Sequence, residues 1–379
     1  MALTLQEVFR RGFDEYARSR RLPGHVYRAA RAIRDCRTAA LGGHLRGCPA
    51  GHVSQVHYNS CRHRACPQCA HIRIERWLEA RRAQLLPCDH YHVVFTIPHD
   101  LEPLWHRNRR RMTDLLFRAV RETLFELIED AKYLGACPGV VATLHTWGRT
   151  LTFHPHIHCV VTGGGASAQG WKPVRNGFLL PVRVVRALFR GKLLAFLRDD
   201  LAREHLARAP ETSRGHWENQ LRRLGQKTWN VRIQERYAHA TGVLLYLGRY
   251  LRGGPLANSR LLAVDDGRVT FRYRDHRDGK PKGMTLPLGA FLQRIVWHVP
   301  EPGRHLVRYW GVYARGQKRR REACRASLAE LPAPVDRRPT RSLRAAASER
   351  RAEAHCPVCD RPLVVLAVWR PGRGPPDVR

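Results

Sequence analysis

The sequence predicts an α+β protein with a metal-held module near its N-terminus. Segments with helical periodicity and short β-rich segments succeed one another without a regular βαβ repeat, which favours helices packed on a sheet layer. Residues 36–70 have few apolar residues in a repeating pattern but are dense in Cys, His and Gly. The 379-residue chain is 43% hydrophobic and carries a formal net charge of +35, so it combines a sizeable core with a strongly basic surface.

That charge favours a polyanionic partner, because 67 Lys and Arg against 32 Asp and Glu repel one another unless an anion neutralises them. No apolar run approaches the ~20 residues that a membrane-spanning helix needs, so we expect nucleic acid and no membrane. The N-terminus lacks the apolar core of a signal peptide. Eleven cysteines, several of them in CxxC pairs or among histidines, indicate metal binding in a reducing cytoplasm.

The N-terminal third is expected to be helical on both sides of the Cys-rich module. Residues 5–19 place five apolar side chains on one helical face, namely Leu5, Val8, Phe9, Phe13 and Tyr16. A break at residues 22–24 precedes a second helix that runs to about Asp35, and a basic helix is expected over about 71–86.

The remaining segments alternate between the two types. Strands are expected over 91–97, 140–144, 157–162 and 229–233, and helical patterns cover 104–133, 183–206 and 239–252. The last of these helices should end at Gly253-Gly254-Pro255. Residues 258–315 are expected to form short strands and one helix. The Pro/Arg/Ala-rich tail after residue 330 is expected to be flexible, except at Cys356-Pro-Val-Cys359.

The Cys/His pattern of residues 36–70 predicts structural zinc, since a knuckle presents two ligands from one turn. The first-choice ligand set is Cys48, His52, Cys66 and Cys69. The remaining candidates would form either a second zinc site or a hydrogen-bonded shell around the first: Cys36, His44, Cys61 and His63. Cys356 and Cys359 form a further CxxC, which could take Cys324 or His355 as partners.

A His-x-His pair at His156 and His158 is a candidate site for a divalent cation. Side chains two apart on a strand share a face, so both imidazoles can reach one ion. Coordination positions would remain for phosphate oxygens, whose charge the ion would stabilise. The competing interpretation is a strand whose histidines lie on a solvated face.

Tyr246 and Tyr250 are candidate nucleophiles, because residues i and i+4 are neighbours on one face of the predicted helix 239–252. Attack of a tyrosine oxygen on a phosphodiester gives a 5′-phosphotyrosine and frees a 3′-OH, which conserves the bond for rejoining. Arg249 lies elsewhere on the helix and is expected to contact DNA. The competing interpretation is that both tyrosines simply pack the helix onto the sheet.

Two further basic segments are expected to contact DNA: helix 71–86 and the cluster Arg107, Arg109, Arg110 and Arg111. A nucleotide site is not expected. Thr162-Gly163-Gly164-Gly165 lacks the spacing of a phosphate-binding loop, and phosphodiester exchange is nearly isoenergetic, so it needs no nucleotide hydrolysis.

Together these motifs resemble the insertion sequence 91 (IS91) family of rolling-circle transposases. The resemblance extends from about residue 5 to residue 315 and rests on a series of motifs: Asn59–Arg62, Cys66–Cys69, His154–Val161, Tyr246–Tyr250, Asn258–Leu262, Val269–Asp275, Met284–Leu286, Phe291–Arg294 and His298–Pro300.

The resemblance implies an N-terminal zinc-binding domain and a nuclease of the HUH (His-hydrophobic-His) type, with a central antiparallel sheet flanked by helices. His156 and His158 would bind Mg²⁺ or Mn²⁺, and Tyr246 and Tyr250 would be the nucleophiles. The third metal ligand stays open among His145, His154 and a polar residue near the tyrosine helix. A bacterial cytoplasmic protein associated with the nucleoid is expected, and a homodimer is left open.

The domains implied are a helical and zinc-binding DNA-binding domain (1–86), the nuclease (87–255), a β-rich extension (256–330) and the basic tail (331–379). The predicted function is that of a transposase that nicks and rejoins single-stranded or hairpin DNA at the ends of an insertion sequence. The alternatives are a plasmid replication initiator or relaxase of the same chemistry, and a non-catalytic zinc protein that binds nucleic acid.

Overall fold

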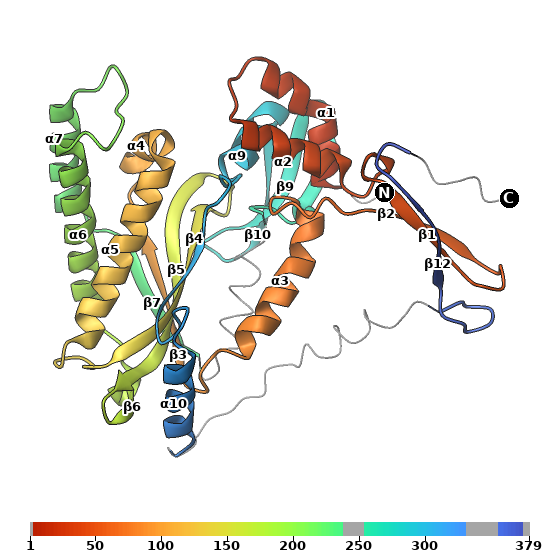
Figure 1. Ribbon diagram of the computed structural model, residues 1–379. Coiled ribbons are helices and arrows are strands. Elements are labelled where there is room, and N and C mark those ends of the chain that lie inside the picture. The colour runs from red at the N-terminus through yellow and green to blue at the C-terminus, as the bar shows by residue number, and fades with distance from the viewer. Residues whose placement is uncertain (1–2, 238–253, 331–354, 374–379) are drawn as a thin grey trace.

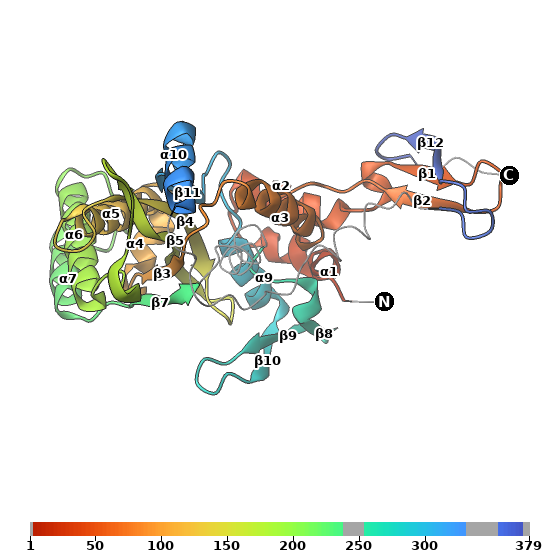
Figure 2. The same cartoon turned by 90° about the horizontal axis from the view of Figure 1, so that it is seen from below.

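The protein consists of three bodies in a row, each built on an antiparallel sheet (Figures 1 and 2). The structure is a computed structural model that describes residues 3–237, 254–330 and 355–373. A helix-covered central sheet lies at one end, a mixed helical body in the middle and a small sheet at the other end. Every strand pairing among the named strands is antiparallel, so the predicted α+β class and antiparallel sheet are confirmed.

The central sheet has the strand order β11-β4-β5-β3-β7, with β6 paired to β5. Its strands are β3 (His90–Thr96), β4 (Cys137–Trp147), β5 (Phe153–Ser167), β6 (Gly170–Pro173), β7 (Val231–Tyr237) and β11 (Val307–Gly311). The predicted strands at 91–97, 140–144, 157–162 and 229–233 correspond to β3, β4, β5 and β7. The long β4–β5 pair forms the middle of the sheet, and its register places His145 opposite His156 and Thr143 opposite His158.

The two faces of the central sheet differ because successive side chains point to opposite sides. One face packs its apolar residues, such as Phe95, Ile157 and Cys159, against a helical layer. Figure 1 shows that layer beside the sheet: α5 (Arg109–Glu129), α6 (Val182–Ala202) and α7 (Arg214–Gln226). The other face carries the histidines of β3, β4 and β5. It is covered in part by Trp77 and Leu78 of α3 (Pro67–Arg82) and by Cys324 of α10 (Lys318–Ala329).

Two helical predictions differ from the structure. The predicted helix over 104–133 is divided into α4 (Glu102–Arg107) and α5, because Asn108 adopts a non-helical backbone conformation between them. Helix α7 was not predicted, although Trp217, Leu221 and Leu224 form a buried stripe at helical spacing. The hydroxyl of Ser213 caps its N-terminus by accepting from the His216 N–H. The predicted helix over 239–252 lies outside the described residues.

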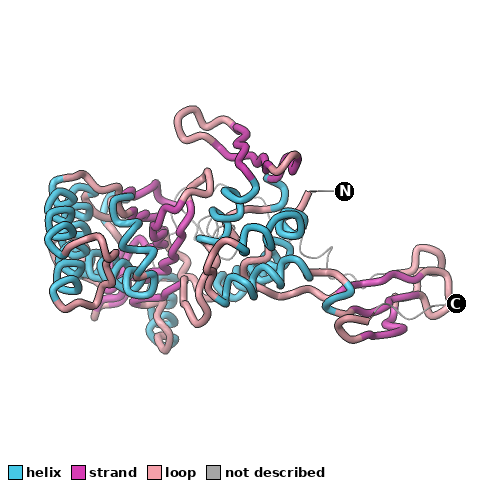
Figure 3. Tube along the Cα trace, turned by 90° about the horizontal axis from the view of Figure 1, so that it is seen from above, coloured by secondary structure: helices cyan, strands magenta, loops and turns pink. Residues whose placement is uncertain are grey.

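The middle body joins the two N-terminal helices to the segment that follows residue 254. Phe9 of the first helix, Phe271 and Phe291 are all buried in its core. Its elements are α1 (Leu5–Arg18), α2 (Gly24–Asp35), β8 (Leu261–Asp265), β9 (Arg268–Arg274), β10 (Pro281–Pro287) and α9 (Leu288–Trp297). The first and third predicted domains therefore share one core, and β11 from the predicted extension completes the central sheet. Figure 3 shows the β9–β10 hairpin projecting from this body.

The small sheet is formed by both ends of the chain. Its strands are β1 (Gly43–Gly47), β2 (Ser54–Tyr58) and β12 (Val364–Trp369), in the order β12-β1-β2. The prediction of a flexible tail after residue 330 is therefore wrong for residues 364–369. The run from Val364 to Trp369 contains three valines, which favour a strand. The Pro and Arg residues on either side of it give the tail as a whole the composition of a flexible segment.

Four short 3₁₀ turns complete the described elements: residues Ala39–Leu41, His99–Leu101, Arg175–Gly177 and Asn258–Arg260. Among the helices that the structure describes, none combines the length and apolarity required to cross a bilayer.

The pairing of β11 with β4 depends on a glycine and can be tested by mutation. Gly311 has a φ of +58°, and a Cβ there would overlap the carbonyl oxygen of Pro138. We expect Gly311→Ala to lose about 1–2 kcal/mol from the left-handed backbone and a further ~1–3 kcal/mol from overpacking. The matched control is Gly316→Ala, where φ is +84° but nothing lies near the added methyl group. Urea unfolding should show the larger loss for Gly311→Ala, and equal losses would contradict the pairing.

Candidate active site

Three histidines converge on the face of the sheet opposite α5 and α6. Their ligand nitrogens all lie within 4.8 Å of one another. His156 and His158 share this face because they are two residues apart on β5, and His145 joins them from the neighbouring strand by cross-strand pairing with His156. The ring centroid of His145 lies 5.4 Å from that of His156 and 4.5 Å from that of His158. The predicted His156–His158 pair therefore lies in a cluster of three.

Hydrogen bonds determine which nitrogen of His156 is free to bind a ligand. Its Nδ1–H donates to the backbone carbonyl of His154 over 2.6 Å. The Nε2 atom consequently keeps its lone pair. A metal-binding histidine typically makes this bond through its second nitrogen.

A chain of two hydrogen bonds, from Gln234 through His92, determines which nitrogen of His158 carries the proton. Gln234 on β7 turns its amide oxygen toward Nδ1 of His92 at 2.7 Å, so that nitrogen carries the proton. Nε2 of His92 is then an acceptor, and Nδ1–H of His158 donates to it over 2.7 Å. In the neutral His158 ring the proton therefore lies on Nδ1, and Nε2 carries the lone pair. The two rings stack with an interplanar angle of 12°, which fixes the orientation of His158.

Burial keeps these imidazoles neutral. Desolvation lowers the pKa of His156 to about 4 and lowers the pKa of His158 well below its ordinary value, with smaller contributions from the neighbouring histidines. At pH 7 both rings therefore present a lone pair rather than a second proton. Acidification toward pH 4 would protonate His156 and occupy its remaining lone pair.

The donor set fits a divalent metal ion. The three imidazoles would provide one face of a coordination sphere and leave positions for phosphate oxygens. No carboxylate belongs to the cluster as the described residues form it. Because Mg²⁺ prefers oxygen ligands and imidazole suits later transition metals, the three histidines favour Mn²⁺ over Mg²⁺.

The geometry discriminates among the candidates for a third ligand. His145 belongs to the cluster, whereas His154 lies outside it and faces His99 at a ring-centroid distance of 5.1 Å. The remaining candidate was a polar residue near the tyrosine helix, which lies outside the described residues.

The predicted zinc ligands divide between two clusters, so the first-choice set is wrong as a group. Cys66 and Cys69 lie with Cys36 and Cys61, whereas Cys48 and His52 lie with Cys356 and Cys359. The β1–β2 hairpin explains the division, because Gly43 pairs with Tyr58 and Gly47 with Ser54. Cys48 and His52 therefore lie at the tip of the hairpin, about 16 Å from its base by strand rise.

The remaining residues that were predicted as zinc ligands lie outside both cysteine clusters. His44 stacks on His57 with ring centroids 5.3 Å apart. His63 accepts from the Ala65 N–H through Nδ1. Cys324 is buried between α10 and the central sheet, and His355 is exposed in an isolated bridge to Pro362.

The sulfur–sulfur distances in the cluster of Cys36, Cys61, Cys66 and Cys69 suit a zinc ion. The sulfur of Cys69 lies 3.5 Å from the sulfurs of both Cys36 and Cys61. Tetrahedral zinc with ~2.3 Å bonds separates its sulfur ligands by ~3.8 Å. Cys66 completes a set of four thiols, three of them buried.

Comparison with known proteins identifies the family. The family model described as "Transposase zinc-binding domain", of the IS91 type, matches residues 8–97, and the model described as "Putative transposase" matches residues 139–321. "Putative transposase y4qJ" of Sinorhizobium fredii (strain NBRC 101917 / NGR234) is 36% identical, over 98% of this chain and 96% of that protein. The "Transposase for insertion sequence element IS801" of Pseudomonas savastanoi pv. phaseolicola is 33% identical, over 74% of this chain and 68% of that protein.

This chain belongs to the IS91 family of transposases. DNA is therefore its partner, as the net charge predicted. No solved structure matches the chain.

The arginine cluster of the transposase is only partly available for DNA. Arg111 forms an ion pair with the buried carboxylate of Asp200, and Arg109 donates to the carbonyl of Trp297 over 3.3 Å. Arg107 and Arg110 are exposed. DNA contact stays a prediction for those two arginines, while Arg109 and Arg111 have intramolecular partners.

Tyr246, Tyr250 and Arg249 lie outside the described residues. The chain enters that segment from β7, the strand whose Gln234 contacts His92 beside His158. It leaves at Gly254, next to the carbonyl of Ala65.

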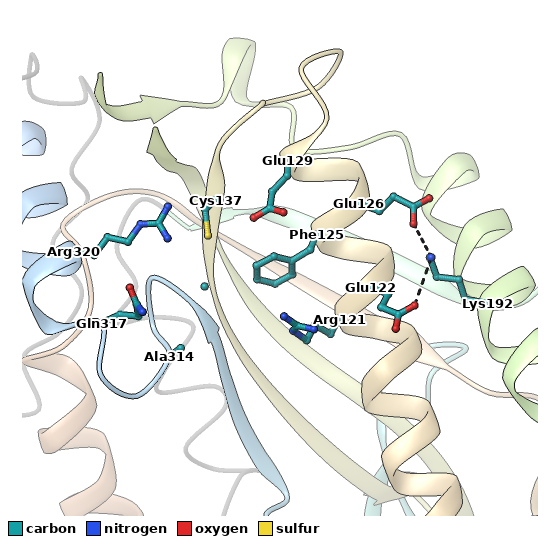
Figure 4. A pocket seen from close by; sticks show the side chains of 11 residues that line it. Arg121, Glu122, Phe125, Glu126, Glu129, Cys137, Lys192, Ala314, Gln317 and Arg320 are labelled. Atoms are coloured by element: carbon teal, nitrogen blue, oxygen red, sulfur yellow. Dashed lines mark ion pairs between the residues drawn. The ribbon is translucent and has the colours of Figure 1, made fainter. Parts of the chain in front are cut away.

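A pocket of about 490 Å³ lies away from the histidines, between α5, α6 and the start of α10 (Figure 4). Lys192 forms ion pairs there with Glu122 and Glu126. Cys137 lines this pocket at the far end of β4, roughly 26 Å from His145 by strand rise. The pocket is therefore not part of the histidine site.

The role of His92 can be tested with a pair of variants. His92→Phe keeps an aromatic ring against His158 but removes the acceptor for its Nδ1–H, whereas His92→Gln restores an acceptor. We expect His92→Phe to weaken Mn²⁺ binding about 10–100-fold, and His92→Gln to recover part of the loss. Titration of free Mn²⁺, followed by electron paramagnetic resonance, measures the Mn²⁺ affinity of both variants. Unchanged affinity in His92→Phe would show that the relay does not orient His158.

Proposed function

We propose that this transposase nicks and rejoins single-stranded DNA at insertion-sequence ends, through tyrosine nucleophiles and a metal ion on His145, His156 and His158. The observation that supports the proposal most directly is the cluster of three imidazoles on β4 and β5, of which burial keeps His156 and His158 neutral. The hydrogen bonds at Nδ1 of His156 and of His158 place the ring proton on that nitrogen, so a metal ion would bind through Nε2.

A metal bound there would polarise the scissile phosphate and stabilise the charge that develops on it. The histidines hold that position, and the relay from Gln234 through His92 orients His158. Neutral rings add no positive charge of their own, so the affinity for DNA comes from the arginine-rich surface.

The nucleophiles proposed are Tyr246 and Tyr250. The phenol oxygen of one tyrosine bonds to phosphorus as the bond to the 3′ oxygen breaks, and that oxygen takes up a proton. The product is a 5′-phosphotyrosine and a free 3′-OH, so strand transfer needs no external energy source. Support comes from the i, i+4 spacing of the pair and from the position of Gln234, which precedes the segment and lies beside the histidine site.

The zinc-binding domain would hold its ion on Cys36, Cys61, Cys66 and Cys69. The four thiols come from the end of α2, the loop after β2 and the start of α3. A zinc ion there would therefore anchor α3, whose Trp77 donates to the hydroxyl of Tyr309 on the central sheet over 2.9 Å. The zinc-binding domain and the nuclease would be fixed to one another in this way.

Replacing the tyrosines tests the nucleophile assignment. Tyr246→Phe with Tyr250→Phe removes two hydroxyl groups and keeps the rings, so we expect normal folding and no protein–DNA adduct. The assay is incubation with single-stranded element ends and Mn²⁺, followed by denaturing electrophoresis. Tyr273→Phe on β9 is the matched control and should form the adduct at the wild-type level. A persistent adduct in the double variant would overturn the assignment.

Replacing the histidines separates catalysis from binding. His156→Ala with His158→Ala should reduce nicking by at least ~100-fold, because the charge on the phosphate is no longer stabilised. Binding of single-stranded DNA should change less than about twofold, since the arginine-rich surface is intact. His216→Ala, an exposed histidine on α7, serves as control. Wild-type nicking by the double variant would show that the cluster is structural.

A further inference from the structure

The second Cys/His cluster joins residues from the two ends of the chain. Cys48 and His52 follow β1, whereas Cys356 and Cys359 precede β12, and the four ligand atoms lie within 4.8 Å of one another. Neither family match includes residues 355–373, so nothing in the zinc-binding domain accounts for the C-terminal pair.

The distances in this cluster suit one tetrahedral ion. The sulfurs of Cys48 and Cys359 are 3.4 Å apart, and Nδ1 of His52 lies 3.7 Å from the sulfurs of both Cys48 and Cys356. Bonds of ~2.3 Å to sulfur and ~2.0 Å to nitrogen place such ligand atoms ~3.5–3.8 Å apart. None of the eleven cysteines, all of them within the described residues, forms a disulfide.

Two turns of similar construction present these ligands. In the first, the Cys48 N–H donates to the Val53 carbonyl and the Ala50 N–H donates to the Cys48 sulfur. In the second, the Cys356 N–H donates to the carbonyl of Arg361, which is again five residues further along the chain. The Val358 N–H donates to the Cys356 sulfur. Backbone N–H groups directed at sulfur stabilise the thiolate, which is the form that binds zinc.

The small sheet has too little apolar core to hold the chain ends together without such an ion. One small cluster consists of Cys48, Cys356 and Leu363, with Val53 and Cys359 packed at the side. Leu45 and Trp369 are the other buried apolar side chains of the sheet's strands. Every residue of β2 is exposed, and on β12 Val365 and Val368 are 53% and 75% exposed. A sheet that buries so few side chains depends on a metal or a covalent link for its stability.

We propose that Cys48, His52, Cys356 and Cys359 bind a second zinc ion, which clasps the C-terminal segment to the N-terminal β1–β2 hairpin. The ion fixes the two turns against each other, and the β1–β12 pairing continues from the clasp, from Gly47 opposite Val364 to Gly43 opposite Trp369. This site is independent of the nicking reaction proposed above. It also makes the C-terminal CxxC part of the zinc-binding module rather than a separate finger.

Zinc stoichiometry tests the clasp. Full-length protein that carries His156→Ala and His158→Ala, which removes the histidine cluster as a further metal site, is the background for every variant below. Purified with zinc under reducing conditions, it should contain two zinc ions per chain by plasma mass spectrometry. Cys356→Ser with Cys359→Ser should contain one, and Cys66→Ser with Cys69→Ser should lose the other ion instead. Cys137→Ser, a half-buried cysteine outside both clusters, is the matched control and should keep two. His52→Cys should keep two and His52→Ala should not, because only the former preserves a ligand.

A cleavage experiment tests the connection between the chain ends directly. A site for a specific protease is inserted after Glu330, and the protein is cut in the presence of zinc. The C-terminal fragment should remain bound through size-exclusion chromatography and dissociate when a chelator is added. The proposal is overturned if the background protein without the histidine cluster holds one zinc, if its Cys356/Cys359 variant still holds two, or if the fragment dissociates while zinc is bound.

Discussion

The antiparallel pairing of β4 with β5 is the constraint on which the functional geometry depends. Its register places His145 opposite His156 and leaves His158 one step along the same face. A shift of one residue would turn His156 and His158 toward the helical layer and expose the apolar residues that now pack there. Ile157, Cys159 and Val161 are fully buried under α5 and α6, so burial on one face holds the histidines in place on the other.

The same sheet also sets the electrostatics of the site. Burial lowers the pKa of His156 and of His158, so both rings stay neutral, and the hydrogen bonds at Nδ1 place the ring proton on that nitrogen. Elsewhere on this face His90 is fully buried between the Cys88 carbonyl and the Tyr313 hydroxyl, and its pKa is lowered to about 4 by burial. Because both of its ring nitrogens are hydrogen-bonded to the protein, His90 has a structural role. It is not a member of the cluster formed by His145, His156 and His158.

Much of this arrangement could be predicted from local patterns. The His156–His158 face follows from strand alternation, and the helices α1 and α2 follow from their apolar periodicity. What could not be predicted is long-range pairing. His145 is eleven residues from His156 and becomes a neighbour only through the hairpin register. The zinc ligands were grouped wrongly for the same reason, since spacing shows which residues form a knuckle but not which two knuckles meet in space.

Anomalous diffraction from crystals grown with Mn²⁺ would show whether the histidine cluster binds a divalent metal ion. We expect an anomalous peak within bonding distance of Nε2 of His156, Nε2 of His158 and a ring nitrogen of His145. An absence of any peak at the three histidines, in crystals of the folded protein saturated with Mn²⁺, would contradict it.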